Sequence, residues 1–232
     1  MKAYLKRVNE KSRSNHFKWL GRVDIYNAQS LPAHVNIESV LEEVDSKVPD
    51  FLMSNIESIF LGEIPSLAER EMDAMYENGT IYIHSPTVVE DDDLVDDIIH
   101  EIAHSLEGSH ALDIYGDGAI EKEFIAKRLK LYHLLEEEGI AVPSMLAFAD
   151  PEYSEELDHF FYHAVGYPLL TSLTINIFLS PYAVTSLREY FANAFEKYFL
   201  GESGSVKILS PKVFDKIESI LNSRKESNYG TI

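Results

Sequence analysis

The sequence contains no cysteine. Disulfides and thiolate metal ligands are therefore excluded, and so are cysteine-based zinc fingers and cysteine nucleophiles. A chain without cysteine fits a reducing compartment, and it equally fits an exported protein that needs no disulfides.

Long hydrophobic runs are also missing. No stretch of about 18 consecutive apolar residues occurs, so we expect no membrane-spanning helix. The longest apolar stretch, 169–179, is interrupted by polar residues such as Thr171 and Asn176. The basic N-terminal residues are followed by no apolar segment of the kind found in a secretory signal. We therefore expect a cytoplasmic location, with export by another route left open.

Basic residues are few relative to acidic ones, with 20 Lys and Arg against 39 Asp and Glu, for a formal net charge of −19. Nucleic acids and anionic membranes are bound through basic surfaces, so neither is an expected partner. A strongly acidic protein would instead attract basic peptides, although the same charge can serve solubility alone. The sequence does not determine the oligomeric state.

The length and composition are those of a globular protein. The chain has 232 residues, of which 45% are hydrophobic and 11% aromatic, enough for a sizeable core. We expect a polar N-terminal segment (1–16), one domain (17–222) and a polar tail (223–232). The domain would comprise an N-lobe of about 17–110 and a helical C-lobe of about 111–222.

Strand signals come before residue 90 and helix signals dominate after it, which predicts an α+β fold with a small N-terminal mixed or antiparallel sheet. Asn-Gly at 78–79 predicts a hairpin over 74–84. Further strands are expected at 17–28 and 51–64. Ranges 141–151 and 180–183 are expected to be connectors. A helix over 37–47 is predicted, with Asn36 as its N-cap, and a second helix, around the motif below, is expected to end at Gly108. Further helices are predicted over 117–138, 155–165, 168–179, 186–200 and 211–223.

The chemistry centres on His100-Glu101-Ile102-Ala103-His104 within an apolar helical pattern. Residues four apart lie on one face of a helix, so His100 and His104 point the same way. Two such imidazoles can hold one Zn²⁺, and Glu101 can take a proton from a water on the metal. The motif therefore predicts metal-assisted hydrolysis, most often of a peptide bond.

An acidic run, Glu90 to Asp93, precedes this helix. Carboxylates are stabilised by the partial positive charge of a helix N-terminus, which accounts for them without a metal. A calcium site is the alternative interpretation.

A catalytic zinc usually takes a third protein ligand, and three candidates follow His104. His110 lies six residues further on, but Glu107 stands where the tight turn of that motif needs glycine. Glu121 or Glu123, about twenty residues on, would give a thermolysin-like arrangement. Glu189 begins a strongly apolar and aromatic helix, where a carboxylate needs a partner.

The stretch around Glu189 resembles part of a known protein family. Glu189-Tyr190-Phe191-Ala192-Asn193-Ala194-Phe195, with Tyr182 seven residues earlier, resembles the catalytic domain of anthrax lethal factor and the related Pro-Pro endopeptidases. The end of the domain, Ser210-Pro211 and a terminal helix, is also similar. The resemblance spans roughly 71–222, with the specific matches confined to the two motif helices.

The resemblance implies a zincin-type metalloendopeptidase with one catalytic Zn²⁺. His100, His104 and Glu189 would be the metal ligands, Glu101 the general base, and Tyr182 a donor to the developing oxyanion. The chain departs from the family at Asn193, often Glu, and at Ala103, often Gly. The segment 113–179 has no counterpart that we can align, so the specificity of the relatives does not transfer.

Other interpretations stay open. The hairpin strand at 81–83 could hold an extended peptide by strand addition. His159 and His163 share helical spacing but have no neighbouring acid placed like Glu101, so we expect ordinary histidines there. The alternatives to an active endopeptidase are a catalytically silent zincin scaffold that binds proteins, a thermolysin-like peptidase using Glu123, and a structural or immunity protein with a basic partner.

Overall fold

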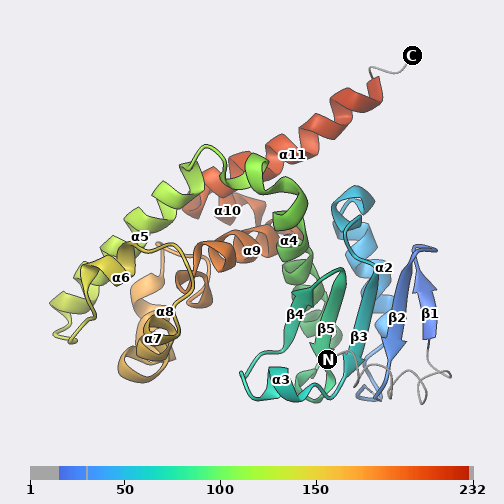
Figure 1. The fold of residues 1–232 in the computed structure, drawn as a ribbon, viewed down its shortest axis with the longest axis horizontal. Coiled ribbons are helices and arrows are strands. Elements are labelled where there is room, and N and C mark those ends of the chain that lie inside the picture. The colour runs from blue at the N-terminus through green and yellow to red at the C-terminus, as the bar shows by residue number, and fades with distance from the viewer. Residues whose placement is uncertain (1–15, 30, 230–232) are drawn as a thin grey trace. The chain divides into compact units, whose positions relative to one another are not determined.

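The computed structural model describes residues 16–29 and 31–229, with side chains described as far as Ser223. A five-stranded mixed sheet comes first in the chain and helices dominate after it (Figure 1), which confirms the predicted α+β class. The chain divides into two compact units, with the division between Ser109 and His110. Within the described part of the chain, no helix has the length and apolarity needed to cross a membrane.

The sheet belongs to the N-terminal unit, which we define as the described residues up to Ser109. Its strand order is β1-β2-β3-β5-β4, in which β2, β3 and β5 are parallel and the two outer pairs are antiparallel. The strands are β1 (His16–Trp19), β2 (Val23–Asn27), β3 (Ser58–Gly62), β4 (Ala74–Glu77) and β5 (Thr80–His84).

The prediction of one strand over 17–28 is wrong, because the chain turns back there as the hairpin β1–β2. The turn places Leu20 at φ 53° and Gly21 at φ 67°. Leucine rarely adopts positive φ, so the single Gly21 is the only local sign of this turn. The strand expected over 51–64 is confined to β3, and Asp50–Met53 forms the 3₁₀ helix η1 instead.

The hairpin predicted over 74–84 is confirmed as β4–β5. Asn78 (φ 50°) and Gly79 (φ 84°) both have the positive φ of a type I′ turn. The prediction that Ile81–Ile83 offers a free edge is wrong, since β5 pairs with β3 on one side and β4 on the other. The outermost strand here is β4.

The helix predicted over 37–47 is confirmed as α2 (Ile37–Lys47), which lies between the parallel strands β2 and β3 in the chain. The Asn36 side chain accepts hydrogen bonds from the main-chain N–H groups of Glu38 and Ser39. Two short elements follow β3 and β5, namely α3 (Pro65–Ala68) and the 3₁₀ helix η2 (Ser85–Thr87).

Helix α4 (Asp91–Tyr115) carries the His-Glu-x-x-His motif. It does not end at Gly108 as predicted; it continues past a kink at His110 (φ −116°, ψ 16°). Gly108 has no positive φ, so the glycine acts as an ordinary helical residue. The apolar face expected for this helix is fully buried: Leu94, Val95, Ile98, Ile99, Ile102, Ala103 and Leu106.

The helical unit comprises the described residues from His110 onward. The helix predicted over 117–138 is confirmed as α5 (Ala119–Glu137), and helices also form near 155–165, 168–179, 186–200 and from 211. The further elements are α6 (Met145–Ala149), α7 (Glu155–His159), the π-helix η3 (Phe160–Val165), α8 (Tyr167–Thr174), the 3₁₀ helix η4 (Tyr182–Val184), α9 (Leu187–Lys197), the π-helix η5 (Tyr198–Glu202), α10 (Ser203–Leu209) and α11 (Pro211–Tyr229).

Four details of this unit differ from the sequence-based expectations. The expected connector 141–151 contains α6, and the turn 180–183 runs into η4. Helix α10 precedes Ser210 where no helix was predicted. The last helix runs on to Tyr229 rather than ending near 223, so most of the expected tail is helical. Of the predicted N-terminal segment, residues 1–15 lie outside the described residues.

Candidate metal centre

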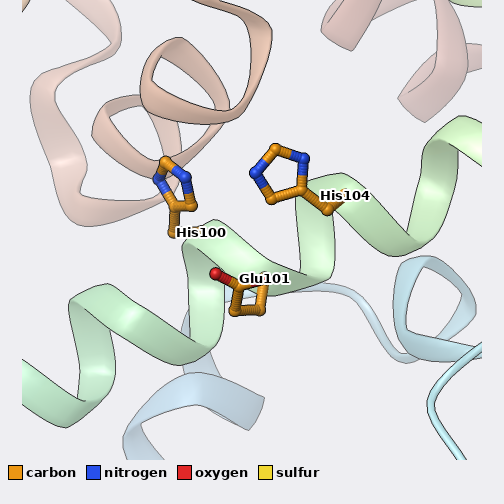
Figure 2. A group of neighbouring side chains, drawn as sticks. All are labelled: His100, Glu101 and His104. Carbon is orange, nitrogen blue, oxygen red and sulfur yellow. The ribbon is translucent and has the colours of Figure 1, made fainter. Parts of the chain in front are cut away.

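Helix α4 brings His100, Glu101 and His104 together. One ligand-type atom from each of the three side chains lies within 4.8 Å of the others. The imidazole ring centroids of His100 and His104 are 5.0 Å apart, and Figure 2 shows both rings on one side of the helix with Glu101 beside them. Two imidazoles one turn apart with a neighbouring carboxylate are a donor set that suits Zn²⁺. The structure thus has the local arrangement that the motif predicts.

The start of α4 is fixed by its acidic run. Asp93 Oδ2 accepts hydrogen bonds from the main-chain N–H groups of Val89 (3.1 Å) and Glu90 (2.9 Å). Asp91 Oδ1 accepts one from the N–H of Asn36 at 2.8 Å. These bonds support the capping interpretation over a calcium site. Among the described residues, the motif is the only group of three or more His, Asp or Glu found close enough to share an ion.

The C-terminal part of the motif is anchored by Asn55, a residue that the sequence analysis does not single out. Its Nδ2 donates to the carbonyl oxygen of Ser105 at 3.0 Å and to Ser109 Oγ at 2.8 Å. Asn55 follows the short helix η1, 50 residues before Ser105. It therefore ties the helix to the N-terminal unit one residue past His104.

Glu101 is buried, with 6% of its surface exposed. Its Oε2 accepts a hydrogen bond from the main-chain N–H of Tyr76 in β4 at 2.6 Å. A carboxylate bonded to a backbone N–H makes a short, charge-assisted interaction that restricts its rotation. The side chain expected to move the proton is thus held by the edge strand β4.

The partly buried Asp97 lies one turn before Glu101 on α4. Burial raises its pKa to about 8, and the nearby carboxylates of Asp73 and Glu101 add to that rise while His100 opposes it. Asp97 therefore favours its neutral form at pH 7, which limits the negative charge around the motif.

A carboxylate on the same helix lies close to the His104 ring. The buried Nδ1 of this ring lies 3.6 Å from Glu107 Oε1, a separation longer than a hydrogen bond, which the pair would make only after a small side-chain shift. A carboxylate on the Nδ1 side favours metal binding through Nε2. Glu107 is the residue that stands where the three-histidine motif would need glycine, and here its carboxylate lies beside the second histidine.

Glu189 and Tyr182 both belong to the helical unit. Glu189 lies in the first turn of α9, and its main-chain N–H donates to Ser186 Oγ at 3.1 Å, an N-cap. Tyr182 begins η4, where its carbonyl oxygen accepts from the N–H (3.1 Å) and Oγ1 (2.9 Å) of Thr185. The residue is 37% exposed. The capped helix start and the bonded turn hold the two residues at fixed places in this unit.

Glu123 serves another purpose in the helical unit. Its carboxylate accepts from Tyr190 Oη at 2.9 Å and from the main-chain N–H of Lys212 at 3.2 Å. The second bond satisfies a donor in the first turn of α11, where a negative charge is favoured. This arrangement supports a structural role and weighs against Glu123 as a metal ligand.

The other histidine candidates also have local contacts. His110 lies at the kink of α4, with Nδ1 3.1 Å from Asp113 Oδ2. The rings of His159 and His163 are 4.2 Å apart at the junction of α7 and η3. No acid joins that pair in a three-residue group among the described residues.

Comparisons with known proteins add no identification: no protein-family model, no curated protein and no solved structure matches the chain. The resemblance to the lethal-factor-like endopeptidases therefore rests on the sequence alone.

Proposed function

We propose that this protein is a zinc-dependent endopeptidase whose metal is held by His100, His104 and Glu189. The observation that carries the proposal is the joint placement of His100, Glu101 and His104 on one helix with Glu101 buried and held. The assignment of Glu189 rests on the sequence, namely on its motif and on the position of Tyr182 seven residues earlier in the chain.

The metal ligands, Glu101 and Tyr182 have different tasks in the proposed reaction. Zn²⁺ held by His100, His104 and Glu189 would supply an acidified water and would polarise the peptide carbonyl. Glu101 accepts the proton of the attacking water and then delivers it to the leaving amine. Tyr182 donates a hydrogen bond to the oxygen on which negative charge develops, a contribution of about 3 kcal/mol in comparable sites.

The substrate class follows from the charge of the chain. The net charge of −19 would raise the local concentration of basic peptides, so we expect peptides rich in Lys or Arg to be cleaved faster than acidic ones of the same scissile sequence. The preference should weaken as salt is added, because surface charges are screened within about 8 Å at physiological ionic strength.

Metal stoichiometry tests the ligand set. The wild-type protein should bind one zinc per chain, measured by elemental analysis after dialysis. His104→Ala and Glu189→Ala should each weaken binding by more than the roughly 10- to 100-fold expected for the loss of an outer-shell partner. Glu123→Gln is the matched control, and its zinc affinity should equal that of the wild type. Loss of zinc in Glu123→Gln with retention in Glu189→Ala would move the third ligand to Glu123.

A further inference from the structure

The main-chain N–H of Tyr76 points away from the sheet. Strands β4 and β5 are antiparallel and joined by the two-residue turn Asn78-Gly79, so the pair Glu77–Thr80 closes the hairpin. Hydrogen-bonded and non-hydrogen-bonded pairs alternate along such a ladder. The pair Tyr76–Ile81 is therefore of the second kind, and its N–H faces the outer side of β4.

That outer side is an edge of the sheet. Strand β4 stands last in the strand order, as Figure 1 shows. An edge N–H normally bonds to water or to an added strand. Here it donates instead to Glu101 Oε2 at 2.6 Å, 25 residues along the chain.

This bond constrains the carboxylate in a specific way. A carboxylate has two oxygens, and a short bond to one of them fixes both its rotation and its distance from the strand. A general base must stand within hydrogen-bond reach of the proton that it takes, and a misplacement of about 1 Å can cost about 100-fold in rate.

We propose that the Tyr76 main-chain N–H is a positioning group for Glu101: it holds Oε2 so that Oε1 is presented to the attacking water. The proposal rests on the proposed peptidase function. It assigns the edge strand β4 a part in the reaction step itself, separate from any part in binding a peptide. The Tyr76 side chain is not needed for this role.

The Tyr76→Pro variant removes the N–H. Proline is tolerated on edge strands where the missing N–H faces outward, so the β4–β5 ladder keeps its bonds. Tyr76→Val is the matched control, because it keeps the N–H and a strand-favouring side chain but loses the phenol, which donates weakly to the Asn55 carbonyl at 3.4 Å. Ala74→Pro is the control for introducing a proline on this edge. By the same alternation, the main-chain N–H of Ala74 also faces the outer side of β4.

Peptide hydrolysis by the zinc-loaded proteins is the first test. Relative to Tyr76→Val, Tyr76→Pro should lower kcat by about 10- to 100-fold, with KM within threefold and one zinc per chain retained. Equal kcat values in the two variants would overturn the proposal. A rise in KM without a fall in kcat would also overturn it, since the N–H would then act in substrate binding.

Amide hydrogen exchange tests the contact without relying on activity. The Tyr76 N–H should exchange slowly in the wild-type protein and at least about 10-fold faster in Glu101→Ala, while the Tyr82 N–H inside the ladder changes little. Equal Tyr76 exchange in both proteins would overturn the proposal, even if Tyr76→Pro failed to fold. A wild-type protein that binds zinc and shows the exchange difference but cleaves no peptide would overturn the proposed function instead.

Discussion

Asp97 makes stability depend on pH in an unusual direction. Its pKa rises from the ordinary value of 3.8 to about 8 in the folded protein. Between pH 5 and pH 8 the folded state therefore holds a proton that the unfolded state has lost, and the free energy of unfolding must fall as pH rises. Above pH 8 both states are ionised, and the effect of this group levels off.

The magnitude follows from the same pKa. Each pH unit between 5 and 8 lowers the free energy of unfolding by about 1.4 kcal/mol, so the total loss over this range is at most about 4 kcal/mol. Partial exposure of the side chain to water reduces this, and we expect about 2 kcal/mol. Asp97→Asn mimics the protonated acid, so the variant should lack this pH dependence and be the more stable protein at pH 9.

Urea unfolding followed by circular dichroism measures the difference. The wild type, Asp97→Asn and the control Asp92→Asn, an exposed residue in the first turn of the same helix, should be compared in EDTA at pH 5 and pH 9. The difference between wild type and Asp97→Asn should change by about 2 kcal/mol between the two pH values, and that for Asp92→Asn by much less. Parallel pH profiles for wild type and Asp97→Asn would refute the reasoning.

Three further predictions concern local structure, and urea unfolding tests each of them. Asn36→Ala removes the N-cap of α2 and should lower the free energy of unfolding by about 1 kcal/mol. An unchanged free energy of unfolding would contradict the capping geometry. Gly79→Ala should destabilise more than Gly21→Ala, because both have positive φ but only at residue 79 would a Cβ lie 3.1 Å from the Glu57 side chain; equal losses would count against that contact. Arg128→Met should lower the free energy of unfolding by about 2 kcal/mol, because this fully buried guanidinium donates to two carbonyl oxygens at the end of α6. An unchanged free energy of unfolding would show that the desolvation of Arg128 cancels those bonds.

The parts of the fold that follow local rules could be predicted from the sequence. Asn78-Gly79 gives the β4–β5 hairpin because both residues tolerate positive φ. Asn36 sets the start of α2, and its end lies just before Pro49. The spacing of His100 and His104 places both imidazoles on one side of α4 because a helix repeats every 3.6 residues.

The features that depend on tertiary contacts could not be predicted. Gly108 looks like a helix stop, yet helix α4 runs on to Tyr115. Ile114, in the part of the helix after Gly108, is fully buried. The bond from Tyr76 to Glu101 depends on the register of β4, which fixes the direction of each N–H only once the sheet is assembled. The raised pKa of Asp97 arises from burial, which the sequence pattern does not reveal.

Cleavage of a broad peptide library by the zinc-loaded wild-type protein and by Glu101→Ala, read by mass spectrometry, tests the central claim most directly. The account predicts cleavage by the wild type and a rate lower by at least about 100-fold in Glu101→Ala, with one zinc per chain in both. Equal cleavage by the two proteins, or no cleavage by zinc-loaded wild type, would contradict it.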